Sequence, residues 1–195
     1  MSYTVIGSLR SPFTRMTRLW LINNNIDFKF EIKNYLEVKE DAEYLARLSP
    51  INRIPVLMDN EKVIFDSRVI FNHINQKHKL MGLSIDEENI LTAIQTCMDV
   101  SVNLFLLKKS GTNLEGGNWY IERQRERVKR CFEYILPWVQ SLKVSDWNYP
   151  AMSLYSYLIW AKFRGVSEVP EHTDLNLFIG KFKNSRGVEE TSFPI

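Results

Sequence analysis

Two short polar motifs carry side chains that could take part in chemistry: Ser11-Pro12 near the N-terminus and Asp66-Ser67 farther along. Each stands where a helix is predicted to begin, because serine and aspartate suit the N-cap position and proline suits the first helical position. A helix N-terminus presents free N–H groups and about half a positive charge, which suits a carboxylate. Taken alone, either motif is more simply explained by helix capping.

The Asp66-Ser67 pair belongs to a continuous unit that covers residues 52–76. Residues 56–58 predict an apolar strand, turn residues follow, and residues 63–65 predict the second strand of a hairpin. Pro55 gives no N–H to a β-ladder, so it must stand at an edge, at a first strand residue or in a special turn. The helix after this pair has its apolar positions at Val69, Ile70, Phe71 and Ile74.

Four elements are predicted before this unit. Residues 3–7 read as a strand, and residues 12–23 read as a helix. Residues 28–32 alternate apolar and charged side chains, the period-two pattern of a half-buried strand, and a charged helix is predicted over residues 38–48. The order β-α-β-α-β-β-α is the layout of a thioredoxin-like domain, which we expect over residues 1–76.

Beyond a linker at residues 77–83, the sequence predicts helices only. Ser84 and Glu87 form a capping box, which opens the first of them. The predicted helices cover residues 84–109, 119–142, 148–164 and 174–183. Residues 184–195 are expected to pack loosely. The predicted fold class is therefore an α/β thioredoxin-like N-terminal domain followed by an all-α helical bundle domain over residues 84–195.

The segment Ile54-Pro55-Val56-Leu57 and the Asp66-Ser67 pair, in this order of elements, resemble the N-terminal domain of the cytosolic glutathione transferases. The resemblance implies that Pro55 is a cis-proline and that the Ile54 backbone pairs with the cysteinyl backbone of glutathione. It also implies that Asp66 and Ser67 hold the γ-glutamyl end, with Asp66 at the ammonium group. The all-helical second half extends the resemblance over nearly the whole chain.

The Ser11-Pro12-Phe13 segment is similar to that of serine-type members of this family, the plant tau class among them. The resemblance implies that the Ser11 hydroxyl donates to the glutathione sulfur and stabilises its thiolate. It also assigns Phe13 and Arg53 to the glutathione site. Arg53 would bind the glycine carboxylate, although a solvated loop arginine explains its position equally well.

A glutathione-dependent transferase is the function that this resemblance implies, acting as a homodimer on a small hydrophobic electrophile. Position alone suggests Leu9, Arg10, Phe105 and Trp160 for the electrophile pocket. A specialised isomerase, dehalogenase or peroxidase remains open, as does a non-catalytic adaptor on the same fold, such as the stringent starvation proteins. Ser11 favours the enzyme, because an adaptor has no need of a thiolate-stabilising hydroxyl.

One position departs from the family pattern. Members usually carry Ser/Thr-x-x-Asp at the start of the central helix of the second domain, whereas here Asn148 takes the cap and Ala151 stands three residues on. Half of that capping box is missing, so we expect about 1 kcal/mol less local stability.

Composition excludes several classes of partner. The net charge of +2 indicates neither nucleic acid nor an anionic membrane surface, and no continuous apolar run reaches the roughly 18 residues of a membrane span. The three histidines share no metal-ligand spacing, so no metal is expected. Cys97 and Cys131 form no CxxC motif and stand among apolar neighbours, which predicts buried, reduced thiols and a cytoplasmic location.

Overall fold

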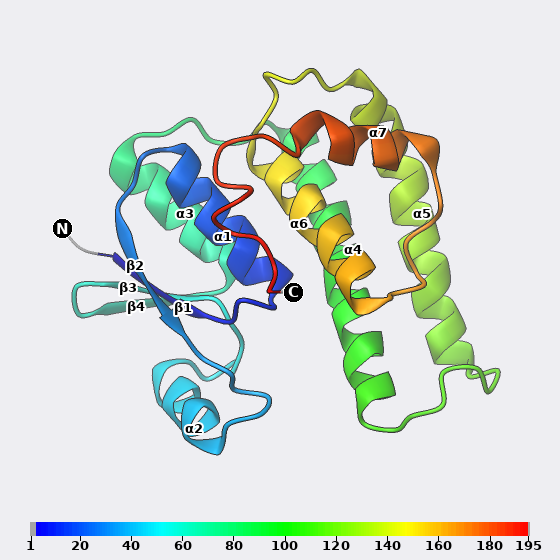
Figure 1. The fold of residues 1–195 in the computed structure, drawn as a ribbon, viewed down its shortest axis with the longest axis horizontal. Coiled ribbons are helices and arrows are strands. Elements are labelled where there is room, and N and C mark those ends of the chain that lie inside the picture. The colour runs from blue at the N-terminus through cyan, green and yellow to red at the C-terminus, as the bar shows by residue number, and fades with distance from the viewer. Residues whose placement is uncertain (1–2, 195) are drawn as a thin grey trace. The chain divides into compact units, whose positions relative to one another are not determined.

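The computed structural model describes residues 3–194, which divide into two units (Figure 1). Unit 1 comprises residues 1–82 and 184–195, and unit 2 comprises residues 83–183. The grouping differs from the expected domains at residues 184–195, which the sequence analysis placed with the helical domain.

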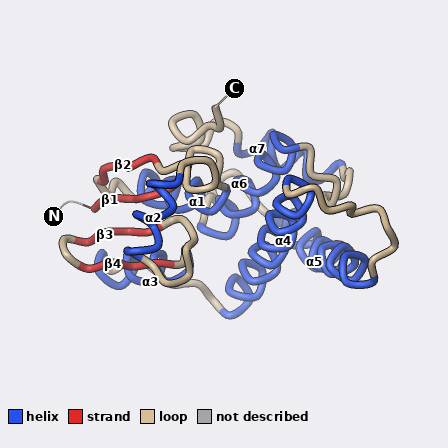
Figure 2. Tube along the Cα trace, turned by 90° about the horizontal axis from the view of Figure 1, so that it is seen from below, coloured by secondary structure: helices blue, strands red, loops and turns tan. Residues whose placement is uncertain are grey.

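Unit 1 is built on a four-stranded sheet with the strand order β2-β1-β3-β4 (Figure 2). Strand β1 pairs in parallel with β2 and antiparallel with β3, and β3 and β4 form the predicted hairpin. The strands are β1 (Tyr3–Gly7), β2 (Phe28–Ile32), β3 (Val56–Asp59) and β4 (Lys62–Phe65). The helices are α1 (Pro12–Asn23), α2 (Lys39–Leu48) and α3 (Ser67–His78). The thioredoxin-like layout is confirmed.

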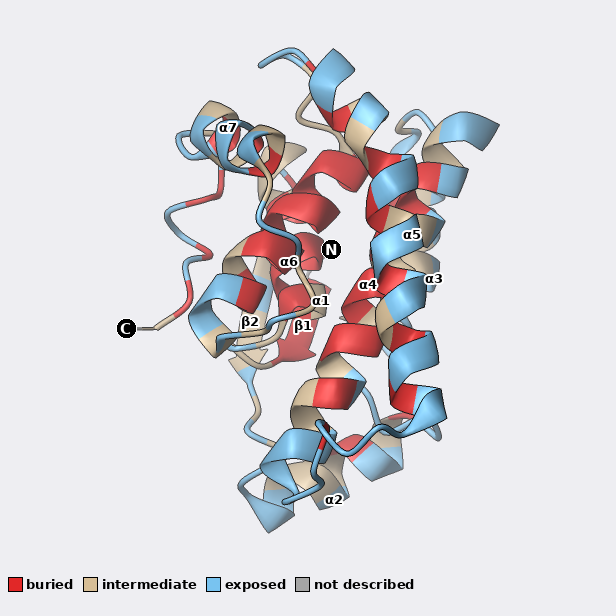
Figure 3. Ribbon diagram, turned by 90° about the vertical axis from the view of Figure 1, so that its right-hand side faces the viewer, coloured by how far each residue is buried: buried red, intermediate tan, exposed pale blue. Residues whose placement is uncertain are grey.

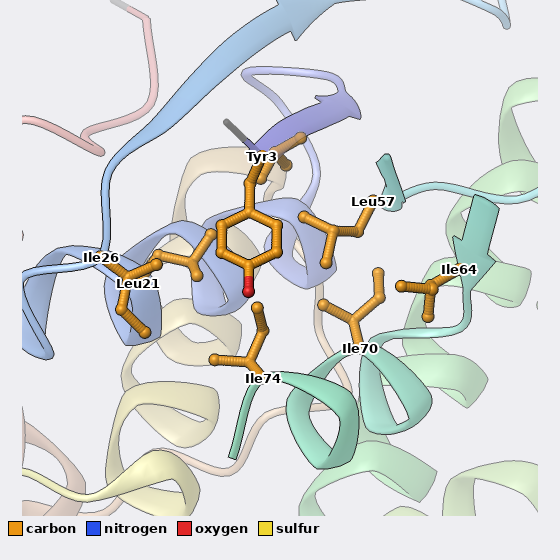
Figure 4. Close-up of a cluster of buried hydrophobic side chains, with 8 residues drawn as sticks. Tyr3, Leu21, Ile26, Leu57, Ile64, Ile70 and Ile74 are labelled. Carbon is orange, nitrogen blue, oxygen red and sulfur yellow. The ribbon is translucent and has the colours of Figure 1, made fainter. Parts of the chain in front are cut away.

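Helices cover both faces of this sheet, because successive strand residues point to opposite sides. One buried cluster joins the sheet to α1 and α3 (Figure 4) and contains Tyr3, Val5, Leu21, Ile26, Leu57, Ile64, Ile70 and Ile74. The other joins the opposite face to α2 and contains Ile6, Leu45, Ile54 and Val56. Val69 was expected on the apolar face of α3. It is instead 51% exposed, because it lies on the side of the helix away from the buried Ile70 and Ile74.

Unit 2 is a helical bundle in which α6 is buried almost all round (Figure 3). Its helices are α4 (Ile85–Lys109), α5 (Trp119–Ser141), α6 (Tyr149–Arg164) and α7 (Thr173–Phe182). Helices α5 and α6 both pack against α4. The all-helical second half is therefore confirmed, with predicted helix ends within one residue of those observed.

Among the described residues, α4 is the one helix that length and composition would allow to cross a membrane, with a mean hydropathy of 1.6 over its most apolar stretch. The helix contains no continuous apolar run of that length, because polar residues such as Gln95 and Asp99 interrupt it. A core helix of a bundle has the same composition, and 44% of that stretch is buried inside the protein.

The N-termini of α4 and α6 meet at one carboxylate. Glu87 completes the predicted capping box, since its Oε2 accepts from the Ser84 amide at 2.9 Å and the Ser84 Oγ accepts from the Glu87 amide at 3.3 Å. Its other oxygen, Oε1, accepts from the side-chain Nδ2 of Asn148 at 3.1 Å, while Asn148 Oδ1 caps α6 at the Ala151 amide. A residue of α4 thus binds the capping side chain of Asn148, whereas position 151 of the family's box would bind the backbone N–H of the cap residue.

Residues 184–195 were expected to pack loosely, but the described part of this segment, residues 184–194, does not. Val188, Thr191 and Phe193 are buried, and this segment runs beside α1 (Figure 1, red). The guanidinium groups of Arg15 and Arg18 on α1 hold it in place. Arg15 donates to the Val188 carbonyl at 3.2 Å and to Thr191 Oγ1 at 3.3 Å, and Arg18 donates to the Glu190 carbonyl at 2.9 Å.

Candidate functional site

Ser11 occupies the N-cap of α1, at the end of the loop that follows β1. Its backbone is extended, with φ −99° and ψ 125°, and its Oγ accepts from the Thr14 amide at 3.2 Å. Proline at the next position suits the first helical turn, because that turn has no use for its missing N–H. Within the described chain, the cap is the one side-chain hydrogen bond of Ser11. The cap uses a lone pair of the oxygen, so the hydroxyl proton of the half-buried Ser11 stays available to an acceptor.

Ile54 and Pro55 lie just before β3, and the peptide bond between them is cis, as the family resemblance implied. Because β3 begins at Val56, Pro55 stands outside the ladder, where its missing N–H costs no hydrogen bond. The Ile54 side chain is buried in the cluster that faces α2. Its backbone N–H and carbonyl make no hydrogen bond within the described residues, so they can pair with an extended ligand, as sheet edges do.

Asp66 caps α3 in a conformation that capping alone does not require. Its Oδ1 accepts from the Arg68 amide at 2.8 Å and from the Val69 amide at 3.4 Å. Its φ is +70°, whereas every other helix N-cap in the described chain has a negative φ. A non-glycine residue in such a region costs about 1–3 kcal/mol, and residues of this kind cluster at functional sites. Ser67 follows as the first residue of α3 and is 5% exposed.

The strand register places these three motifs at one edge of the sheet. Ile6, near the end of β1, pairs with Val56 at the start of β3, and Val56 pairs with Phe65 at the end of β4. The loop leading to Ser11, the Ile54-Pro55 bond and the Asp66-Ser67 pair therefore all leave the sheet at the same side. An extended peptide lying along this edge would meet a hydroxyl, free backbone groups and a carboxylate.

Arg53 is exposed in the loop before Ile54 and lies close enough to Tyr35 to act on its charge. Burial raises the pKa of the Tyr35 phenol, and the positive charge of Arg53 opposes part of that rise. Tyr35 was not among the residues predicted for the site. It follows β2, which pairs in parallel with β1, so the residues after Ile32 leave the sheet at the same edge as the loop after Gly7. Tyr35 could have been placed near the site only if this parallel pairing had been predicted.

The positions of the other residues predicted for the site do not by themselves indicate a ligand. Phe13 is half-buried in the first turn of α1. Leu9 is half-buried, and Arg10 is exposed and paired with Glu37 at 3.6 Å. Phe105 and Trp160 contact each other edge to face in unit 2, with ring centroids 5.8 Å apart.

Residues 1–76 match the family model described as "Glutathione S-transferase, N-terminal domain". Two curated relatives align with part of the chain. Glutathione S-transferase U3 of Arabidopsis thaliana is 33% identical over 73 residues, which is 37% of this chain and 32% of the relative. Dichloromethane dehalogenase of Methylophilus leisingeri is 28% identical over 65 residues, 33% of this chain and 24% of the relative. The aligned parts thus span a third or less of those relatives.

Solved structures match the whole chain. A glutathione S-transferase of Methylobacterium radiotolerans, in complex with glutathione sulfonate, has a TM-score of 0.83 at 15% identity and covers 100% of this chain and 97% of its own. One from Methylobacillus flagellatus with glutathione bound has a TM-score of 0.81 at 16% identity, over 99% of this chain and 100% of its own. Residues 1–76 are therefore similar to the N-terminal domain of the glutathione S-transferases, and the chain has the same fold as the solved glutathione transferase structures.

Proposed function

We propose that this protein is a glutathione transferase that binds glutathione along the sheet edge of unit 1 and stabilises its thiolate with Ser11. The observation that carries the proposal is the Ser11 hydroxyl, which caps α1 through its oxygen and keeps its proton for an acceptor. Ile54, with its free backbone groups, and Asp66, in its unusual conformation, lie off the same edge. The glutathione-bound structures with the same fold support this choice of ligand.

In this proposal each part of glutathione meets a group suited to it. The Ile54 backbone pairs with the cysteinyl residue, Asp66 accepts from the γ-glutamyl ammonium, and the Ser67 end of α3 receives the γ-glutamyl carboxylate. Arg53 binds the glycine carboxylate as an exposed cation, and Phe13 contacts the ligand from the first turn of α1.

The energetic requirement on Ser11 is modest. Lowering the pKa of a free thiol from about 8.5 by about 2 units takes about 2.7 kcal/mol. A hydrogen bond to a charged group supplies about 1.5–3 kcal/mol, and a helix N-terminus supplies about 0.3–1 kcal/mol more. These two contributions suffice without a histidine or carboxylate base beside the sulfur.

The nucleophile is then the sulfur of glutathione rather than a side chain of the protein. It attacks an electrophilic carbon, with release of the leaving group, to form a thioether. Dichloromethane, after which one curated relative is named, is an electrophile of that kind. We further propose a homodimer and a cytoplasmic location, in keeping with the family's usual organisation.

Replacing Ser11 by alanine tests this proposal. We expect the pKa of bound glutathione, followed by ultraviolet difference spectra of its thiolate, to rise by about 1–2 units, because one charge-assisted hydrogen bond is lost. Conjugation at pH 7 should fall about 3- to 25-fold with a general electrophile such as a halogenated nitrobenzene, in proportion to the lost thiolate. The calorimetric Kd for glutathione should change less than about threefold, since the backbone and carboxylate contacts remain.

Ser84→Ala is the matched control, because Ser84 is also an N-cap serine but lies on α4 of unit 2. It should cost a similar cap energy, about 0.5–2 kcal/mol, and leave the thiol pKa unchanged. Unchanged turnover and thiol pKa in Ser11→Ala would remove Ser11 from the mechanism. No binding of the native protein at millimolar glutathione would favour an adaptor on this fold.

A further inference from the structure

Cys97 and Cys131 stand on different helices of unit 2, yet their side chains interact with each other. Cys97 lies on α4 and is completely buried, and its Sγ donates to the Val128 carbonyl of α5 at 3.8 Å, one turn before Cys131. Cys131 lies on α5 and is only half-buried, whereas its apolar neighbours in the sequence predicted a buried thiol. One thiol of the pair is thus closed to solvent, and the other is open to it.

Cys131 opens into a surface pocket of about 400 Å³. Its lining residues come from α5, apart from Ala93 of α4: Arg123, Glu126, Arg127, Arg130, Cys131 and Tyr134. Arg130 is paired with Glu126 at 3.0 Å, and Arg127 donates to the side chain of Gln124 at 2.8 Å. Three guanidinium groups against one carboxylate leave the pocket positively charged, so it favours a ligand with carboxylates.

The surroundings of Cys131 make it the more reactive thiol. The interaction with the Cys97 thiol and the charge of Arg127 outweigh the effect of burial and lower the pKa of Cys131 to about 7. The same interaction, together with burial, raises the pKa of Cys97. Cys131 is therefore the thiol of the pair that ionises more readily, and the thiolate is the form that attacks a disulfide.

We propose that Cys131 is a thiol–disulfide exchange site for small disulfides that carry carboxylates, and that Cys97 is its resolving thiol. In the first step the Cys131 thiolate attacks one sulfur of the bound disulfide, forming a mixed disulfide and releasing the other half as a thiolate. In the second step the Cys97 sulfur attacks the Cys131 sulfur, which forms a Cys97–Cys131 bond and releases the remaining half, while the Cys97 proton passes to solvent. The small disulfide is the oxidant and leaves as two thiols.

The two steps should differ in rate. Cys97 is buried and lies against Cys131 rather than in the pocket, so it attacks no ligand directly. It has to ionise in an apolar site before it can resolve the mixed disulfide. The mixed disulfide should therefore accumulate first, and a bond between α4 and α5 should follow.

Glutathione disulfide is a suitable probe, since it carries carboxylates on both halves. We expect intact-mass measurements on the full chain at pH 7 to show one glutathionyl adduct first and then a product lighter than the native chain by two hydrogens. Cys97→Ser and Cys97→Ala should both stop at the adduct, and peptide mapping should place it on Cys131. Cys131→Ser should show neither product. A chain that stays unmodified, or an adduct confined to Cys97, would overturn the proposal.

The role of the arginine pocket is tested by comparing disulfides. Glutathione disulfide should react at least about fivefold faster than the neutral disulfide of 2-mercaptoethanol after correction for their intrinsic rates, and Arg127→Gln should remove most of that preference. Arg47→Gln, an exposed arginine of α2 outside the pocket, is the matched control and should keep it. Equal corrected rates for the two disulfides in the native chain would refute charge selection.

This exchange does not rest on the proposed transferase reaction. Ser11→Ala should form the adduct and the internal disulfide at the native rates, because Ser11 belongs to unit 1 and takes no part in either step. A loss of exchange in Ser11→Ala would show that the ligand reacts from the Ser11 site, and would contradict the assignment to the pocket of α5.

Discussion

Ser11 and Asp66 each cap a helix, and each keeps polar atoms beyond those that the cap uses. Ser11 accepts at its oxygen and retains its proton. Asp66 is exposed and accepts both of its hydrogen bonds within the described chain at Oδ1, which leaves Oδ2 for a ligand. From the sequence, capping and ligand binding looked like competing explanations of these residues. The structure makes the two compatible, because a cap needs only one lone pair. The positive φ of Asp66 had no sequence signal, since aspartate is an ordinary N-cap residue.

Asp59 holds the end of β3 to the last turns of α3. Its carboxylate accepts from Lys77 Nζ at 2.7 and 2.5 Å and lies 2.9 Å from His73 Nε2. Burial alone would raise the pKa of Asp59, but the hydrogen bonds from Lys77 and His73 outweigh it, and the pKa is lowered. The folded chain therefore binds this proton less readily than the unfolded chain does. The stabilisation is fully present above the unfolded pKa of about 4 and is lost as pH falls through the folded pKa.

Asp59→Asn should remove that part of the pH dependence. We expect the urea midpoint of the native chain to drop more steeply than that of the variant as pH falls below about 4, so that the two curves converge in acid. At pH 7 the variant should be the less stable of the two, because Lys77 loses its ionised partner. Parallel curves over this range would show that Asp59 does not carry the effect.

At the scale of elements, most of the fold follows from local sequence signals. Caps, turns and hydrophobic periodicity predicted the strands and the helices with ends close to those observed, because these signals act within a few residues. The partners that elements choose in space have no such signal. The second oxygen of Glu87 binds Asn148, and Cys97 meets Cys131, only because α4 packs against α6 and α5.

Glu87 couples the starts of two helices, so its effect should not add to that of Asn148. Glu87→Ala and Asn148→Ala should each cost about 0.5–2 kcal/mol of unfolding free energy as caps are lost, and the double variant should cost less than their sum by about 0.5–1 kcal/mol. Denaturant unfolding of the four proteins measures this coupling. Asn118, the N-cap of α5, provides the control, because Asn118→Ala should add to Glu87→Ala. A coupling near zero for Glu87 and Asn148 would mean that their hydrogen bond does not stabilise the bundle.

At the scale of the whole molecule, the chain leaves unit 1 at residue 82, builds unit 2 and returns to unit 1 at residue 184. The sequence analysis missed this return because residues 184–195 form no periodic element, and their burial depends on donors supplied by α1. Arg15 and Arg18 bind carbonyl groups of the returning segment, and their guanidinium groups also lie over Phe193 and Phe30, at 4.8 and 4.2 Å.

The returning segment should stabilise unit 1 in particular. Arg18→Met keeps much of the side-chain volume but loses the hydrogen bond to the Glu190 carbonyl, and we expect it to cost about 1–3 kcal/mol. Hydrogen exchange should show faster opening of α1 and β2, with α6 of unit 2 unchanged. Glu190→Ala is the control, since Arg18 binds its backbone and its side chain is exposed; it should stay within about 0.5 kcal/mol of the native chain. Equal loss in the two variants would show that the hydrogen bond to the Glu190 carbonyl is not what stabilises unit 1.

The return of residues 184–195 to α1 also sets an order for folding during synthesis. At about 5–20 residues per second, the ribosome takes about 5–20 s to make unit 2 after residue 82 has been added. Throughout that time Arg15 and Arg18 lack the carbonyl groups that complete their surroundings in the native protein. Unit 2, which is continuous in sequence, can close as soon as it emerges. The half of the protein that is made first is therefore the half that is finished last.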